Sequence, residues 1–356
     1  MLIYIIIFSG VILTTIFSPK NKKIAIFWLL FICFLSVFRA ESVGTDTKNY
    51  TNIQRMLVLY EYDYEGVSFS KNIELISSSL YEIVYKNALS RRLPIVFFSL
   101  VTFLFLFISL KRSKFSYGIG LTVFLILFYL SSFNIARQIC ACSVVLYSYT
   151  FLFEESKKRY LFLVFVLLSS FIHVATIFFI ILYFIRYIEK IPLNKRTLTL
   201  IATLLFLLNI VSPINLSEYL TMLLGNVSFA EIYSERAVTS SRSIMGILQD
   251  VVKFASLILI FNYGKNNKKI TSLDFLFYFS IIASVFSANA HSDFARIFLP
   301  LEFFQILYLP YLYQQNRNFI KSPAFLFFVI VYSFFTLWGA SIGSGEVVPY
   351  VLDLSF

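Results

Sequence analysis

Residues 160–185 read YLFLVFVLLSSFIHVATIFFIILYFI, an apolar run of 26 residues that Ser169, Ser170 and His173 interrupt near its middle. A bilayer core takes ~20 apolar residues per helix, so this run is too long for one ordinary membrane-spanning helix and too short for two. How the chain passes through it decides the side of a membrane on which every later loop lies.

The composition around this run is that of a protein whose main solvent is lipid. Of the 356 residues, 59% are hydrophobic and 14% charged, and the mean hydropathy is +0.80. Soluble domains usually hold ~25% charged residues. The other apolar runs are 2–17, 24–38, 94–110, 117–133, 135–153, 197–211, 244–261, 271–288, 294–313 and 323–338. We therefore expect an all-α, polytopic integral membrane protein with a single membrane domain over residues 1–356.

Basic residues in the loops indicate the path through 160–185, because cytoplasmic loops are enriched in Lys and Arg. Lys20, Lys22 and Lys23 place the first loop inside, so the N-terminus and segment 39–93 lie outside. A single crossing at 160–185 would put all later basic clusters outside, whereas a hairpin broken near His173 keeps them inside. The later basic residues are Arg186, Lys190, Lys195, Arg196, Lys265, Lys268, Lys269, Arg317 and Lys321. We predict a broken hairpin at 160–185, about 12 transmembrane helices or half-helices, and both termini outside.

The net charge of +11 follows from this arrangement. The loops predicted to be inside hold 18 of the 30 Lys and Arg residues but only four acids, so the basic excess marks the cytoplasmic side. It gives no reason to expect a nucleic-acid partner. The cysteines, Cys33, Cys140 and Cys142, lie in apolar runs and are predicted to be packed thiols, because two residues apart on a helix do not share a face.

Two extracytoplasmic segments, 39–93 and 212–243, are long enough to build a site. The first contains a predicted amphipathic helix, with Ile76, Leu80 and Val84 on its apolar face and Glu74 elsewhere. The second is rich in Tyr and polar residues, which suit sugars through ring stacking and hydroxyl bonds. An aromatic belt at the membrane interface is the alternative explanation for these Tyr residues.

Polar and ionisable residues at the outer ends of the apolar runs are the candidates for a site, because such residues are costly in a membrane. They are Arg39, Asp46, Arg137, Gln138, His173, His291, Asp293 and Arg296. The predicted topology brings them all to the outer side. Asp250 and Lys253, three residues apart on one helical face, are predicted to be only an intrahelical ion pair.

Each candidate also has a structural explanation. Arg39 could anchor the end of a helix at the interface, and Asp46 could bond the backbone of its own turn. His173 could be a packed side chain at the break of the hairpin. Asp293 and Arg296 could form an intrahelical ion pair.

The order and spacing of these residues resembles the EpsG family, the Wzy-like polymerases of bacterial exopolysaccharide, capsule and O-antigen. The matching stretches are Arg39, Val43-Gly44-Thr45-Asp46, Asn49-Tyr50, Phe133-Asn134-Ile-Ala-Arg137-Gln138, Lys157-Lys158-Arg159, Ser170-Phe-Ile-His173, and Arg296 with Phe298. They extend over nearly the whole chain. Thr47 departs from the pattern, since an aromatic residue often follows the Asp, and segment 212–243 has no match.

The resemblance implies transfer of an undecaprenyl-diphosphate-linked glycan onto another lipid-linked repeat unit at the outer face of the plasma membrane. Arginine suits the departing diphosphate because its planar fork bonds phosphate oxygens in pairs. The general base is predicted to be His173 or Asp46. The predicted substrate-binding residues are Arg39, Arg137, Gln138, Asp293 and Arg296.

Cofactors are not expected, and the two histidines and scattered acids show no metal-ligand spacing, although a divalent ion between the diphosphate and Asp46 stays open. The expected partners are the lipid-linked oligosaccharide, the bilayer, a flippase and a chain-length regulator.

Two other classes of protein share some of these features. A lipid-linked oligosaccharide flippase would also contain broken helices, but would carry polar residues through the full membrane depth and an inverted repeat. A membrane-bound acyltransferase would need a route to a cytoplasmic acyl donor, and the inner loops contain no histidine.

Overall fold

Helices make up the fold in the part of the chain that the computed structural model describes, residues 1–61, 74–152, 157–188, 193–211, 244–263, 270–287 and 296–354. These ranges contain no β-strand and one isolated bridge, between Arg39 and Leu352. The expected all-α fold is therefore confirmed. The predicted outer segment 212–243 lies outside the described residues, as do residues 62–73 of the first outer segment.

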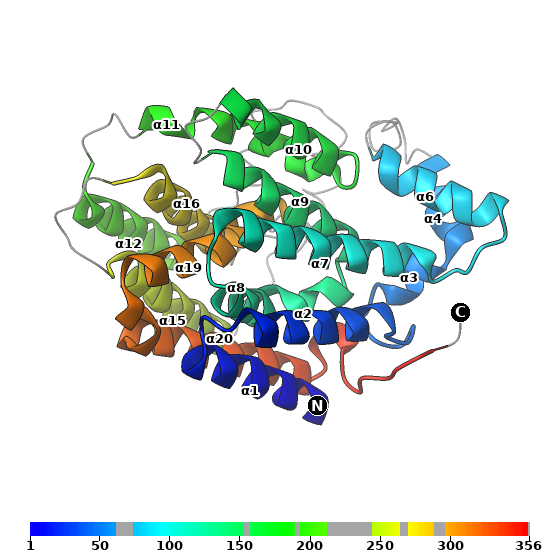
Figure 1. The fold of residues 1–356 in the computed structure, drawn as a ribbon, viewed down its shortest axis with the longest axis horizontal. Helices are drawn as coiled ribbons and strands as arrows, with labels where there is room; N and C mark the ends of the chain where they lie inside the picture. The colour runs from blue at the N-terminus through cyan, green and yellow to red at the C-terminus, as the bar shows by residue number, and fades with distance from the viewer. Residues whose placement is uncertain are drawn as a thin grey trace.

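The helices follow the chain in two sets (Figure 1). The first is α1 (Leu2–Phe17), α2 (Lys22–Val37), α3 (Thr47–Thr51), α4 (Ile53–Glu61), α6 (Leu75–Lys86), α7 (Leu93–Ser113), α8 (Tyr117–Phe124), the π-helical η1 (Leu125–Tyr129), the 3₁₀-helical η2 (Ser131–Phe133) and α9 (Ala136–Leu152). The second is η3 (Lys157–Arg159), α10 (Tyr160–Ser170), η4 (Val174–Phe184), α11 (Ile185–Ile188), α12 (Lys195–Val211), α15 (Ile244–Phe261), α16 (Ser272–Ser287), η5 (Arg296–Phe298), α18 (Leu299–Phe303), α19 (Gln305–Gln315), η6 (Arg317–Lys321), α20 (Pro323–Ser341) and η7 (Ser344–Glu346).

Every apolar run of the sequence carries helix in the described residues. Two of these helices, α7 and α20, are long and apolar enough by themselves to cross a bilayer, with mean hydropathies of 2.6 and 1.8. The shorter apolar helices are Leu2–Phe17, Tyr117–Tyr129, Tyr160–Ser170, Val174–Ile188 and Ser272–Ser287. Two spans settle that apolar helices are present, and the complete membrane topology is part of the proposal below.

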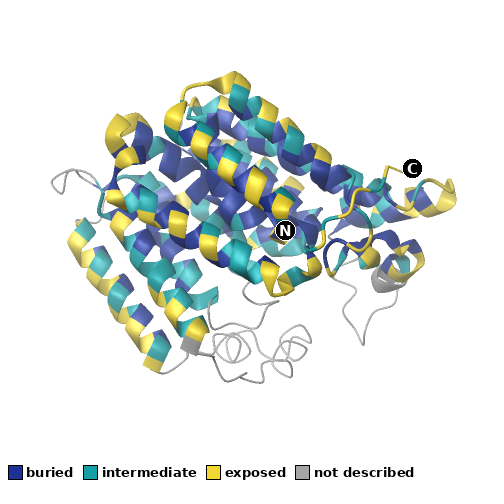
Figure 2. Cartoon of the chain, turned by 90° about the horizontal axis from the view of Figure 1, so that it is seen from below, coloured by how far each residue is buried: buried dark blue, intermediate teal, exposed yellow. Residues whose placement is uncertain are grey.

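The core is centred on α9, which α7, α10 and α18 contact (Figure 1). Ile139, Cys140, Cys142, Leu146 and Tyr149 of this helix are fully buried. A helix that is apolar on all sides lies inside a large protein or a membrane. The cysteines are free and buried, as predicted. The outer helices instead expose apolar side chains along their length, shown in yellow in Figure 2.

The break at His173 is confirmed. The α10 helix ends at Ser170, His173 has extended backbone angles (φ −148°, ψ 116°), and the chain then returns as the 3₁₀ helix η4. The two arms lie against each other, because Ser169 Oγ is 2.7 Å from Thr176 Oγ1 and the Arg159 guanidinium lies 4.8 Å from the Tyr183 ring centre. The beginning and end of the run are therefore neighbours, as a hairpin requires.

The α6 helix differs from the predicted amphipathic pattern. Its buried residues are Ser77, Tyr81 and Val84, while Ile83 is exposed. The reason is that α6 docks on the tip of the hairpin through hydrogen bonds, with Ser77 Oγ donating to the Ile172 carbonyl at 2.8 Å. The first residue before this helix, Glu74, is consequently buried and does not face solvent as the sequence pattern indicated.

The C-terminal segment runs beside the loop that follows α2. Ala40 N donates to the Val351 carbonyl at 2.8 Å, and Arg92 pairs with Asp353 at 3.1 Å. Tyr4 of α1 donates its hydroxyl to the Val347 carbonyl at 2.7 Å. The beginning of α1, the loop after α2 and the C-terminal segment therefore lie at one end of the molecule, beside α3, α4 and α6 (Figure 1).

Candidate functional site

A tightly fixed loop places the first candidate residue, Asp46. Gly44 has φ +93°, and a Cβ atom there would lie 2.7 Å from the Phe133 carbonyl oxygen, so only glycine fits without strain. Thr45 donates to Asn134 Oδ1 from its backbone N at 2.8 Å and from its Oγ1 at 3.2 Å. The loop is thus held against the junction between η2 and α9.

The C-terminal segment covers the other side of this loop. Gly44 N donates to the Glu346 carbonyl at 3.0 Å and Thr45 N to the Gly345 carbonyl at 3.2 Å. The Asp46 side chain does not cap the helix that follows it; its Oδ1 accepts from Asn49 Nδ2 at 3.3 Å. The carboxylate is therefore turned toward the side chains of α3 and away from its own turn.

Glu74 connects three elements at the hairpin break. Its carboxylate is 4% exposed and accepts from Arg137 Nη1 of α9 at 2.8 Å and from Val174 N of η4 at 3.1 Å. Its Oε1 also lies 3.3 Å from His173 Nδ1. Burial acts to raise the pKa of Glu74, but the charge of Arg137 and the contacts with His173 and Val174 outweigh it and hold the pKa at about 2. Glu74 is therefore a buried, ionised carboxylate at neutral pH.

These elements enclose a cavity of about 170 Å³, which we call the first cavity. It is lined by Asp46, Asn49, Tyr50, Arg55, Met56, Ile135, Arg137, Gln138, His173 and Arg296. Five of the seven committed candidate residues thus meet in one place, from α3, α9, the hairpin break and η5. Three arginines against Asp46 and the adjoining Glu74 leave a positive excess, which suits an anionic ligand.

Two side chains of the first cavity are held by internal bonds on one side only. Gln138 is 3% exposed; its Nε2 donates to the Arg296 carbonyl, while its Oε1 accepts no hydrogen bond from any described residue. Tyr50 donates its hydroxyl to the Asn134 carbonyl at 3.3 Å, and burial raises its pKa. A buried amide oxygen without a donor costs free energy, which a bound ligand with a hydroxyl group would recover.

Arg39 does not line the first cavity. It is 1% exposed, and its guanidinium donates to the Ser36 carbonyl at 2.6 Å and approaches Thr47 Oγ1 and Ser99 Oγ at 3.4 Å. The guanidinium also lies 5.0 Å from the centre of the Phe133 ring. Arg39 thus sits behind the loop that carries Asp46, because its donors are turned inward to α2, α3 and α7.

Two further candidates, His291 and Asp293, lie outside the described residues. Within the described ranges, no group of three or more His, Cys, Asp and Glu side chains is arranged to hold a metal ion.

The sequence did not reveal Glu74 and Asn134 as parts of the site. Glu74 precedes a helix with alternating polar and apolar residues, a pattern that predicts exposure for a carboxylate. Asn134 was recognised only as part of a motif. The sole local signal for either one is a polar residue beside a break between apolar runs.

The fold and the first cavity define a helical protein with an apolar exterior and a basic cavity that contains a histidine. The chain belongs to the EpsG family, which it matches over residues 22–352, so the resemblance noted in the sequence is confirmed. No curated protein and no solved structure matches the chain. The family is typically membrane-embedded and indicates a polysaccharide polymerase-like function.

Proposed function

We propose that the protein is a membrane-embedded glycosyltransferase that transfers an undecaprenyl-diphosphate-linked glycan onto another lipid-linked repeat unit at the outer face of the plasma membrane. The observation that carries the proposal is the constellation of Arg137, Glu74 and His173 at the hairpin break. It lies in a cavity that Asp46 and Arg296 also line. The product would be an exopolysaccharide, a capsule or an O-antigen.

The apolar exterior supports the membrane setting. The outward side of α12 exposes more than half of each of these side chains: Leu200, Leu204, Leu207, Leu208 and Val211. Soluble proteins rarely expose contiguous apolar surfaces of this kind. The hairpin supports it too, because α6 supplies hydrogen bonds to the backbone at the tip, as a helix break at membrane depth requires. The positive-inside rule then puts α3, α4, α6 and both termini on the outer side.

The arginines of the first cavity provide the electrostatic part of the reaction. Arg137 is held by Glu74 at 2.8 Å, and Arg296 follows the described end of η5 with its carbonyl bonded to Gln138. A diphosphate bound between Arg137, Arg296 and Arg55 would have its charge stabilised as the bond to the sugar breaks. Donors aimed at developing charge contribute about 100-fold to 1,000-fold each in comparable enzymes.

His173 is suited to be the general base because Glu74 orients it. Nδ1 faces the Glu74 carboxylate and therefore carries the proton, which leaves the Nε2 lone pair for the acceptor hydroxyl. The hydroxyl oxygen attacks the anomeric carbon of the donor sugar and its proton passes to Nε2. The bond between the anomeric carbon and the diphosphate oxygen breaks, and the diphosphate leaves with the bonding electrons. Glu74 is a positioning residue in this scheme, and Asp46 is the alternative base.

The test is chain growth in cells and with purified protein. Arg137→Ala leaves the buried Glu74 without its ion pair, so Arg137→Lys is made beside it, which keeps the charge but loses the fork. We expect both variants, and His173→Ala, to accumulate single lipid-linked repeat units at normal protein levels. Arg112→Ala is the control, because Arg112 stacks on Phe151 at 4.0 Å away from the cavity.

Two outcomes would contradict the proposal. Long chains made by both Arg137→Lys and His173→Ala would remove these residues from the mechanism. Repeat units that build up on the cytoplasmic face of cells carrying the variants would instead indicate a flippase.

A further inference from the structure

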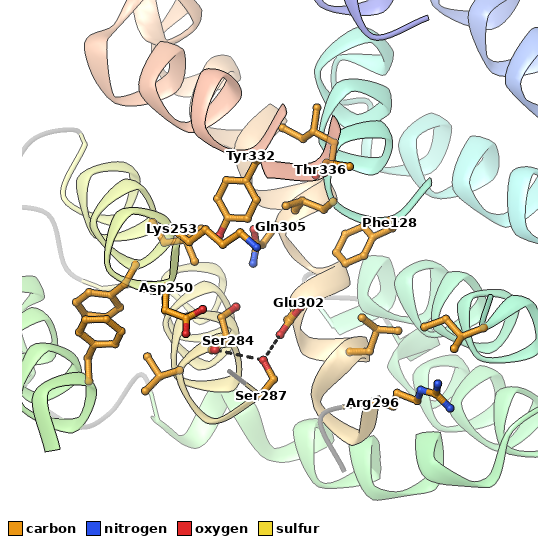
Figure 3. Close-up of a pocket in the computed structure, with 18 residues that line it drawn as sticks. Phe128, Asp250, Lys253, Ser284, Ser287, Arg296, Glu302, Gln305, Tyr332 and Thr336 are labelled. Atoms are coloured by element: carbon orange, nitrogen blue, oxygen red, sulfur yellow. Dashed lines mark hydrogen bonds between the residues drawn. The ribbon is translucent and has the colours of Figure 1, made fainter. Parts of the chain in front are cut away.

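A second cavity of about 320 Å³ lies on the other side of Arg296, between η1, α15, α16, α18, α19 and α20 (Figure 3). Its polar lining residues are Asp250, Lys253, Ser284, Ser287, Arg296, Glu302, Gln305, Tyr332 and Thr336. The remaining walls are apolar or aromatic, including Phe128, Phe206 and Phe254. Polar side chains thus gather inside a helical bundle whose other contacts are almost entirely apolar, which is costly unless they have a use.

The polar groups of the second cavity form two sides. On one side, Ser287 Oγ lies 3.0 Å from Glu302 Oε1 and 3.2 Å from the Ser284 carbonyl. On the other, the Lys253 ammonium lies 5.5 Å from the centre of the Tyr332 ring, and Gln305 is beside them in the view of Figure 3. Hydrogen-bond acceptors and donors therefore face the same space from opposite helices.

Gln305 gives an independent sign of a ligand. Its side chain is 2% exposed and lines the second cavity, yet its Oε1 accepts no hydrogen bond from any residue in the described ranges. Burying an amide oxygen without a donor costs about 1–3 kcal/mol. Gln138 Oε1 stands in the same condition in the first cavity. Each cavity thus presents one buried acceptor that a hydroxyl group could satisfy.

The chemistry of the lining selects the class of ligand. Two carboxylates, Asp250 and Glu302, disfavour a second phosphate, and the described residues contain no metal-ligating cluster. A purely apolar chain would leave the polar groups unpaired. A neutral ring that carries many hydroxyl groups fits, because it can donate to Glu302 and Gln305, accept from Lys253 and stack on aromatic walls. The volume is at the lower end of the range for small-molecule pockets, about 300–1,000 Å³.

We propose that the second cavity binds a sugar residue of the lipid-linked glycan, with Gln305 and Glu302 accepting hydrogen bonds from its hydroxyl groups and Lys253 donating to it. The two cavities share Arg296 and Ile135 in their walls, so a glycan bound at the first can extend into the second. This inference rests on the proposed function and adds a specificity site to it. It also changes the reading of Asp250 and Lys253, which the sequence indicated as a simple intrahelical pair.

The first experiment measures sugar binding without any reaction. The probe is the free oligosaccharide released by mild acid from the lipid carrier of a strain that lacks this protein. We expect it to raise the thermal unfolding midpoint of the purified wild type and of Arg137→Lys, because it contains no phosphate. Gln305→Met keeps the length of the side chain but removes the acceptor, and Glu302→Gln removes the charge. Both should weaken binding about tenfold, the equivalent of one hydrogen bond of about 1.4 kcal/mol.

The second experiment identifies the source of the sugar. Initial rates are measured with the single repeat unit varied at a fixed concentration of lipid-linked chain, and then with the chain varied. In Gln305→Met, KM should rise about tenfold in one arm while kcat stays within about threefold, and the arm that responds tells whether acceptor or donor sugar is bound. Ser148→Ala is the control, since Ser148 is buried on α9, bonds its own helix and lines neither cavity.

The two proposals can fail separately. If Arg137→Lys stops chain growth but Gln305→Met and Glu302→Gln bind and react as the wild type does, the sugar site is wrong and the proposed function stands. If the oligosaccharide stabilises the wild type but not Gln305→Met while the purified protein forms no chains, the sugar site stands and the polymerase function is wrong.

Discussion

Replacing Glu74 by Gln removes the charge that joins α6, α9 and the hairpin while keeping the size of the side chain. A pKa of about 2, against an ordinary 4.5, corresponds to about 3 kcal/mol in favour of the ionised form of the folded protein. The folded-state pKa is lowered, so this stabilisation is fully present above pH ~5 and is lost as the pH falls from ~4.5 toward ~2. We expect Glu74→Gln to lower the free energy of unfolding by about 3 kcal/mol at pH 7, and by about half as much at pH 3.

The measurement is unfolding of the purified protein in detergent at both pH values, for wild type and variant side by side. Activity gives a second, separate readout. With an amide beside Nδ1, His173 is no longer held in the form that leaves Nε2 free, so we expect kcat to fall at least about 100-fold with KM within about twofold. Glu74→Asp keeps the charge on a shorter side chain and should recover part of the rate.

The reasoning would be refuted by an unfolding difference between wild type and Glu74→Gln that is the same at pH 7 and pH 3. It would equally be refuted by a variant that is destabilised but retains the wild-type kcat, because Glu74 would then be only structural.

Further predictions concern the loop, the hairpin and its topology. Gly44→Ala should destabilise the protein by about 1–3 kcal/mol, because it combines a positive φ with a clash against a main-chain oxygen; Gly343→Ala has a positive φ but open space, so it should cost less in the same thermal unfolding assay. In a background without the natural cysteines, Tyr187→Cys should resist a membrane-impermeant maleimide in intact cells while Glu41→Cys reacts, and the reverse would sink the inward return of the hairpin. Ser77→Ala should cost about 1 kcal/mol and lower the polymerisation rate, since it releases the hairpin tip; an unchanged rate would separate α6 from the site.

Much of the architecture followed from local sequence properties. The apolar runs predict the helices because each residue's preference for lipid or protein interior is independent of its distant neighbours. The break near His173 was also predictable, since the length of the run and the basic loops after it admit one consistent path. The structure bears out both the helices and the break.

The site was predictable where its residues are unusual in their own surroundings. Arg137, Gln138 and His173 interrupt apolar helices, and the sequence singles them out for that reason; the structure brings them into one cavity with Asp46 and Arg296. Arg39 shares the same sequence signal but lies behind the loop, because the direction of a side chain depends on packing that its neighbours in sequence do not determine.

The sequence by itself determined which segments are apolar helices, where one of them breaks, and which polar residues are out of place in them. Only the tertiary structure decided that Glu74 is buried between Arg137 and His173, and that Asp250, Lys253, Glu302 and Gln305 face a common cavity. The physical reason is that hydrophobicity and helix periodicity are properties of neighbouring residues. The pairing of buried charges instead joins residues tens of positions apart, whose meeting depends on how the whole chain packs.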